Sequence, residues 1–201
     1  MDEKATLHHY LRTRRAQLLA KLDGLGEYDI RRPMTPTGTN LLGLVKHVAS
    51  VELDYFGEVF GRPSGRVLPW FAEGAEPDAD MWATPEQSRA EIVELHHFSA
   101  AHTDATIEAL PLDAPGVVPW WRDERRNVTL HQMLVHMCAE TAQHLGHADI
   151  LRELIDGSAG QGPDDPNLPQ RGSAEQSAYV ERLEAAARQA TAPQGDALHE
   201  G

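Results

Sequence analysis

The chain has 201 residues, of which 31 are acidic and 18 are Lys or Arg, and its formal net charge is −13. This length fits one domain with an appendage. The excess of acidic residues argues against nucleic acid or an anionic membrane as the main partner, because both are bound through clustered Lys and Arg side chains. Outside the predicted helices, the basic cluster is formed by Arg122, Arg125 and Arg126.

A single cysteine, Cys138, rules out an internal disulfide framework and is typical of a reducing compartment. The amino terminus, MDEKATLHHYL, has no basic region followed by an apolar run. No apolar stretch approaches the roughly 20 residues that a membrane-spanning helix needs. We therefore expect a cytoplasmic protein that binds no membrane, and we interpret Cys138 as a packing residue.

Amphipathic segments separated by loops with Pro and Gly predict four long helices. They are expected over residues 5–23, 40–60, 84–110 and 129–156. Asn40 is a good capping residue for the second helix. Thr84, Pro85 and Gln87 have the pattern of a capping box that opens the third. His96 and His102 on the third helix are expected at the surface or at an edge.

The last long helix has local signals at both ends. Thr129 and Gln132 form a capping box, and Gly157 suits the left-handed conformation that ends a helix. The preceding loops are long, and the aromatic residues of residues 61–83 favour an ordered loop. The sequence thus predicts an all-α four-helix bundle over residues 1–157 with long interhelical loops.

Residues 158–201 have a different composition and are predicted to be an appendage. Gly, Pro, Asp and Gln dominate up to Gly172, which is typical of a linker. An additional carboxy-terminal helix is expected to begin at Ser173, and the last dozen residues are expected to be flexible. The chain has no Gly-rich phosphate loop and no G-x-S-x-G motif.

Four ionisable residues share one face of the helix predicted over residues 129–156. They recur at steps of four, four and three, so they fall within an arc of roughly 80° on a helix. These residues are His136, Glu140, His144 and His147. The same arc contains the apolar residues Met133, Met137, Leu151 and Leu154. Burying the four polar groups without partners would cost several kcal/mol, so something must satisfy them.

The spacing of these four residues alone leaves two interpretations of this helix face open. A divalent metal would satisfy it, because imidazole nitrogen and carboxylate oxygen are its usual ligands and an E-x-x-x-H pair presents both on successive turns. A hydrogen-bonded polar network inside the bundle would also do so. His47 lies among the apolar residues of the second helix, and ligands from facing helices are how bundles build metal sites.

Two segments resemble the DinB-like superfamily, in particular the branch with mycothiol-dependent maleylpyruvate isomerase and thiol-S-transferase relatives. They are TGTNLLGLVKHVASVELDYFGEVF (37–60) and TLHQMLVHMCAETAQHLGHADILRELIDG (129–157). The resemblance covers about residues 5–157. It implies a DinB-like bundle, a homodimer in many relatives, and a divalent metal bound by His47, Glu140 and His144.

In this interpretation His136 and His147 are catalytic candidates that contact the substrate or support the ligands. Two histidines and one carboxylate leave a coordination position open, as in catalytic zinc sites. Zn²⁺ is the expected metal, with Ni²⁺ or Fe²⁺ as alternatives.

The resemblance also suggests a low-molecular-weight thiol such as mycothiol, whose sulfur the metal would activate toward a small electrophilic substrate. Arg122, Arg126 and Trp120 are candidates to bind the thiol or the substrate. Three alternatives stay open: metal-dependent hydrolysis, a non-catalytic metal-binding or small-ligand-binding bundle, and a polar stripe that forms a subunit interface without metal.

Overall fold

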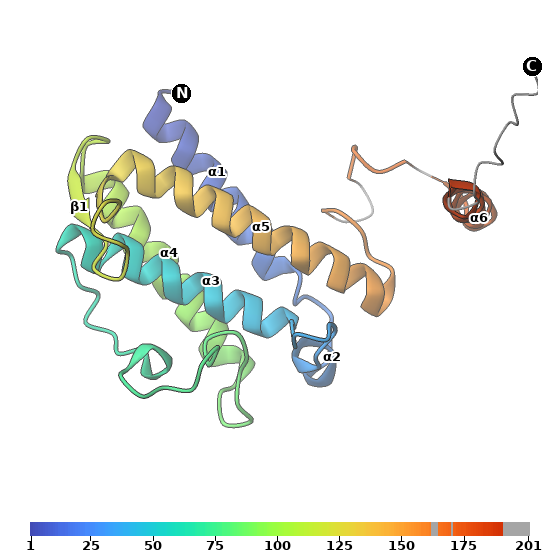
Figure 1. The fold of residues 1–201 in the computed structure, drawn as a ribbon, viewed down its shortest axis with the longest axis horizontal. Coiled ribbons are helices and arrows are strands. Elements are labelled where there is room, and N and C mark those ends of the chain that lie inside the picture. The colour runs from blue at the N-terminus through green and yellow to red at the C-terminus, as the bar shows by residue number, and fades with distance from the viewer. Residues whose placement is uncertain (162–164, 170, 191–201) are drawn as a thin grey trace, which may run out of the picture. The chain divides into compact units, whose positions relative to one another are not determined.

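The computed structural model describes residues 1–161, 165–169 and 171–190, and it confirms the all-α fold (Figure 1). Four long helices make up the bundle: α1 (Glu3–Ala20), α3 (Leu41–Phe56), α4 (Arg89–Ala109) and α5 (Leu130–Asp156). Helix α5 packs against α1 and α3, and α4 packs against α3 and α1. The order around the bundle is therefore α1, α5, α3, α4.

The predicted caps of α3 and α5 are confirmed. The Asn40 side chain accepts a hydrogen bond from the backbone N–H of Gly43 at 2.8 Å. At the start of α5, the Gln132 side chain accepts a hydrogen bond from the Thr129 backbone N–H at 2.8 Å. The Thr129 hydroxyl accepts one from the Gln132 backbone N–H. Gly157 ends α5 with a φ of 80°. These local interactions fix the length of the helix that carries most of the polar face.

The predicted start of α4 is wrong. The helix begins at Arg89, capped by Ser88, whose backbone N–H donates to the Glu91 side chain at 2.7 Å. Both T-P-E-Q and S-R-A-E fit a capping box, and only the second forms one. Residues 84–87 instead make a turn whose Gln87 carbonyl accepts from the Arg31 side chain at 2.8 Å.

The connections between the long helices contain short elements. Helix α2 (Glu27–Arg31), which was not predicted, lies between α1 and α3. The 3-10 turns η1 (Glu58–Phe60) and η2 (Pro69–Phe71) follow α3. Before α5, the strands β1 (Pro115–Val117) and β2 (Asn127–Thr129) form an antiparallel pair in the register Gly116 to Val128.

The bundle buries apolar side chains at both of its ends. One end holds Leu18, Leu42, Val45, Leu145 and Leu151. The other holds Leu11, Phe56, Leu130, Met133 and Met137. Leu154, which was placed on the same arc of α5, is mostly exposed because it lies in the last turn of the helix.

A layer of buried polar side chains separates the two apolar ends. It contains Arg15, Glu52, His96, Ser99, Thr103 and Thr141. Its residues come from all four long helices, at positions between the two apolar groups. The expectation that His96 lies at the surface or an edge is wrong, since only 5% of it is exposed. Burial lowers the pKa of His96 to about 4, so its imidazole is neutral near pH 7.

The chain divides into two compact units, residues 1–163 and 164–201. In the second unit, α6 (Ser173–Ala190) forms the additional helix expected from the sequence. The Gly172 backbone N–H donates to the Glu175 side chain at 3.1 Å at its start. The predicted flexible tail lies outside the described residues. Among the residues that the structure describes, no helix is long and apolar enough to cross a membrane.

Candidate metal centre

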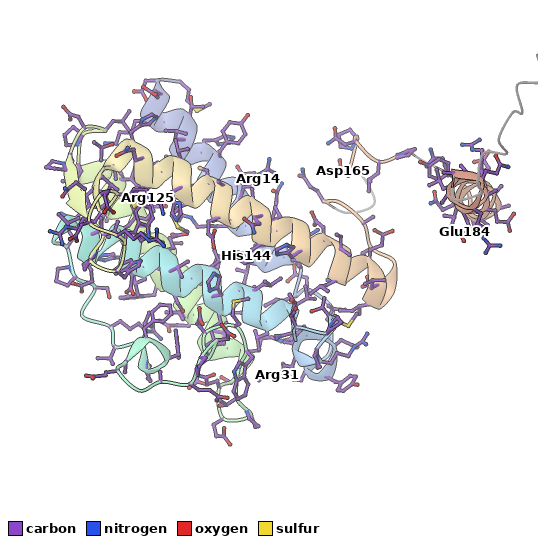
Figure 2. The ribbon with its side chains drawn as sticks, viewed as in Figure 1. Arg14, Arg31, Arg125, His144, Asp165 and Glu184 are labelled. Atoms are coloured by element: carbon purple, nitrogen blue, oxygen red, sulfur yellow. The ribbon has the colours of Figure 1, made fainter. Side chains whose placement is uncertain are left out.

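Three side chains from two facing helices meet in the middle of the bundle. His47 comes from α3, and Glu140 and His144 come from successive turns of α5. His144 is labelled in Figure 2. One donor atom from each of the three lies within 4.8 Å of the other two. Glu140 Oε1 is 3.1 Å from His144 Nε2 and 3.4 Å from His47 Nε2. The structure thus brings together the three residues that the resemblance implied as metal ligands.

The carboxylate of Asp80 fixes the tautomer and the orientation of the His47 ring. His47 Nδ1 lies 2.6 Å from Asp80 Oδ2. Because a carboxylate can only accept, Nδ1 carries the proton and donates it to Asp80. Nε2 then faces the cluster, and in the neutral ring it has a free lone pair. A carboxylate that orients a histidine in this way is a common partner of metal-binding histidines.

The neutral tautomer leaves acceptors facing each other across the cluster. His47 Nε2 and Glu140 Oε1 both carry lone pairs, and at 3.4 Å they repel unless a proton or another cation lies between them. The donor set of two imidazole nitrogens and one carboxylate oxygen suits a divalent metal such as Zn²⁺. The residues present therefore fit a metal ion by their chemistry and by their mutual distances.

The pKa shifts of His47 and Glu140 also favour positive charge at the centre of the cluster. Burial lowers the pKa of His47, but the hydrogen bonds and charges of Asp80 and Glu140 outweigh it and raise the pKa overall. Burial raises the pKa of Glu140, and the two histidines lower it further than burial raises it. The carboxylate is therefore held in its charged form, ready to bind a cation.

The two predicted catalytic histidines lie on either side of the cluster along α5. His147 is exposed, and its ring centroid is 5.5 Å from that of His144. The His136 ring packs against the rings of Tyr55 and Trp121, at 5.0 and 5.2 Å between centroids. Neither belongs to the group of three possible ligands.

The predicted thiol-binding or substrate-binding residues divide into two groups. Trp120 packs against Tyr55, with 5.4 Å between ring centroids, and lines a cavity on the face of α3 that carries His47. Arg122 and Arg126 are exposed, as is Arg125 in the same loop between β1 and β2 (Figure 2). Arg126 forms an ion pair with Asp123 at 3.1 Å. The structure thus places Trp120, but neither arginine, in the wall of this cavity.

Asp80 was missed because it lies in the long loop before α4, where the sequence has no periodic pattern. Lys46, the neighbour of His47, is buried and binds this loop. Its Nζ donates to the carbonyls of Ala79 and Trp82, at 2.6 and 2.8 Å. Burial lowers the pKa of Lys46 to about 8, against the opposing charge of Asp80. Because the two carbonyls flank Asp80, Lys46 holds this carboxylate against His47.

Replacing Asp80 by asparagine is expected to weaken zinc binding about 10- to 100-fold, because the amide no longer fixes the His47 tautomer. Competition with a chromogenic chelator measures this affinity. Asp78→Asn changes an exposed acid of the same loop and should leave the affinity unchanged. If Asp80→Asn binds zinc as tightly as the wild type, Asp80 does not orient a metal ligand.

Fold and cluster together define a class of protein: an all-α bundle of four long helices with a His, Glu and His group between two of them that could hold a metal ion. The sequence model of one family, described as mycothiol-S-transferase, matches residues 6–157. This match covers more than half of the chain, so the chain belongs to the mycothiol-S-transferase family, a branch of the DinB-like bundles. No curated protein matches the chain.

Proposed function

We propose that the protein is a metal-dependent S-transferase that joins the sulfur of mycothiol, or of a similar low-molecular-weight thiol, to a small electrophilic substrate. The observation that carries this proposal is the group of His47, Glu140 and His144, with Asp80 behind His47, in a member of this family. Zn²⁺ is the proposed metal, with Ni²⁺ or Fe²⁺ as alternatives. A homodimer in the cytoplasm is part of the same proposal.

His47 Nε2, Glu140 Oε1 and His144 Nε2 would bind the metal. A bound divalent metal supplies Lewis acidity, which lowers the pKa of a thiol and favours the thiolate near neutral pH. Asp80 keeps the His47 proton on Nδ1, so Nε2 stays available. Cys138 takes no part, because its Sγ donates to the Leu7 carbonyl and burial raises its pKa.

In the proposed reaction the thiol loses its proton to solvent, and its sulfur lone pair forms a bond to an electrophilic carbon of the substrate. The group displaced from that carbon leaves with the electron pair of the broken bond. His136 and His147 are proposed to contact the reactants, and Trp120 to cover them. Arg122 and Arg126 are proposed only as exposed charges that an anionic reactant could meet.

The test is a transfer assay on the full chain with zinc, mycothiol and monobromobimane, whose bromide the thiol displaces to give a fluorescent thioether. We expect product formation above the uncatalysed rate, and its loss in His47→Ala and after chelation. His97→Ala removes an exposed imidazole of α4 outside the group of three and should leave the rate unchanged. Metal-dependent ester hydrolysis without thiol would favour a hydrolase, and a rate independent of metal would contradict the proposal.

A further inference from the structure

A cavity of about 340 Å³ lies on the face of α3 that carries His47, one to two helical turns further along the helix. Its wall consists of Val51, Asp54 and Tyr55 from α3, Phe71 from η2 and Trp120 from the loop before β2. This volume is at the lower end of the range for small-molecule pockets. The cavity therefore suits a small ligand or one group of a larger ligand.

The cavity and the cluster share the same helix faces. Val51 follows His47 by one turn of α3 and Tyr55 follows it by two, which places them about 6 and 12 Å further along the helix axis. On α5, His136 precedes Glu140 by one turn, and its ring meets that of Tyr55 at 5.0 Å. A substrate that reacts at the metal centre can thus extend into the cavity.

Among the described residues, Asp54 is the only acidic one in the wall of this cavity, and its charge is not compensated. Within residues 1–161, 165–169 and 171–190, no hydrogen bond or ion pair engages its carboxylate. Burial, together with the nearby charge of Glu58, raises its pKa to about 6. The carboxylate is therefore mostly ionised at pH 7.5 without a positive partner, at a position where charge is unfavourable. A cationic ligand would relieve this cost.

The remaining walls are largely aromatic. The rings of Tyr55 and Trp120 are inclined at 55°, with 5.4 Å between their centroids, and Phe71 adds a third ring to the wall. Faces of aromatic rings attract ammonium groups, most strongly where water is partly excluded. Phe71 and Trp120 are partly exposed, so the site is open to solvent on one side, and three rings beside one carboxylate are a combination that binds alkylated ammonium ions. A neutral apolar group would use the rings but would leave Asp54 unpaired.

We propose that this cavity binds an ammonium group, so that, given the proposed function, the electrophilic substrate of the transferase carries a positively charged nitrogen. The charge pairs with Asp54, and the carbon atoms around the nitrogen contact Tyr55, Phe71 and Trp120. The overall negative charge of the protein, formally −13, also favours the approach of a cation.

The test compares choline with 3,3-dimethyl-1-butanol, which has the same shape but carbon in place of the charged nitrogen. Binding is measured by calorimetry on the full chain at pH 7.5, without thiol or electrophile. We expect choline to bind at least tenfold more tightly than the neutral analogue. Equal binding of the two, tighter binding of the neutral analogue, or no binding of choline would overturn the proposal.

Variants assign the binding to this cavity. Asp54→Asn should weaken choline binding at least tenfold and leave the neutral analogue unaffected, and Trp120→Ala should weaken both. Asp113→Asn removes one negative charge at an exposed position outside the cavity wall and should change neither. Circular dichroism verifies that Asp54→Asn is folded. If folded Asp54→Asn binds choline like the wild type, the cavity is not the ammonium site.

This experiment is independent of the proposed reaction, because it uses neither thiol nor electrophile. Choline binding that depends on Asp54, in a protein without transferase activity, would uphold the ammonium site and reject the transferase. Transfer of a thiol to bimane without choline binding would uphold the transferase and reject the ammonium site.

Discussion

Replacing His144 by alanine is expected to remove most of the bound metal while leaving the helix content unchanged. His144 Nε2 lies 3.1 Å from Glu140 Oε1, and its loss leaves only two of the three possible ligands. Removing a residue that merely orients a ligand already costs 10- to 100-fold in metal affinity, so removing the ligand itself should exceed about 100-fold. Alanine is the best helix former, so α5 should remain intact. Elemental analysis and far-UV circular dichroism measure the two effects.

Two further variants of α5 test whether the metal is bound by His144 and Glu140 specifically. His147→Ala truncates an exposed neighbour of His144 outside the group of three, and we expect it to retain the wild-type metal content. Glu140→Gln should bind zinc weakly, because an amide oxygen is a poorer ligand than a carboxylate. If His144→Ala keeps one equivalent of metal, His144 is not a ligand. If His147→Ala loses the metal as well, the choice of ligands on this face is wrong.

The parts of the fold that local signals control could be predicted from the sequence. Thr129, Gln132 and Gly157 mark both ends of α5 because capping depends on residues that are close in the chain. The start of α4 was missed because two neighbouring segments offer equivalent capping boxes. Contacts from distant residues favour the turn at the first of them: Arg31 and Lys46 both bind Gln87.

The candidate site could be predicted only in part, for a similar reason. Glu140 and His144 are four residues apart on one helix, so their proximity follows from helix geometry alone. The pairing of His47 with them was suggested by its place among the apolar residues of a second helix, and the resemblance to the DinB-like superfamily selected this set of three. Asp80 and Asp54 could not be found in this way. Asp80 reaches His47 through the path of an irregular loop, and the setting of Asp54 depends on Phe71 and Trp120, which are distant in sequence.

Replacing Arg15 by methionine is expected to destabilise the bundle by about 3–5 kcal/mol, as is usual when one partner of a buried ion pair is removed. Arg15 Nε lies 3.3 Å from Glu52 Oε2, and both side chains are almost completely buried in the polar layer. Arg15 also donates to Asp104 Oδ1 at 2.9 Å. Urea unfolding of the metal-saturated protein at pH 7.5 measures the loss. Arg12→Met removes a largely exposed cation 3.7 Å from Asp104 and should cost at most about 1 kcal/mol.

The large loss of stability expected for Arg15→Met comes from the charge of Glu52, and the pH dependence of that loss tests this explanation. Burial already raises the pKa of Glu52 above its ordinary value near 4.5, although Arg15 opposes the shift. Without Arg15, with Asp104 and His8 as the remaining charged or titratable neighbours, this pKa should rise further. A raised pKa means that the folded state takes up the proton more readily than the unfolded state, so stability increases as the pH falls toward 4.5. The deficit of Arg15→Met should therefore be smaller at pH 5 than at pH 8.

A double variant separates charge from packing. In Arg15→Met with Glu52→Met, no unpaired charge is left in the polar layer, and apolar replacement of a buried ion pair is often neutral or stabilising. We therefore expect the double variant to recover most of the stability that Arg15→Met loses, and its deficit should not shrink at pH 5, because it has no Glu52 carboxylate to take up a proton. A double variant as unstable as Arg15→Met would mean that the packed stem of Arg15, and not its charge, supports the middle of the bundle.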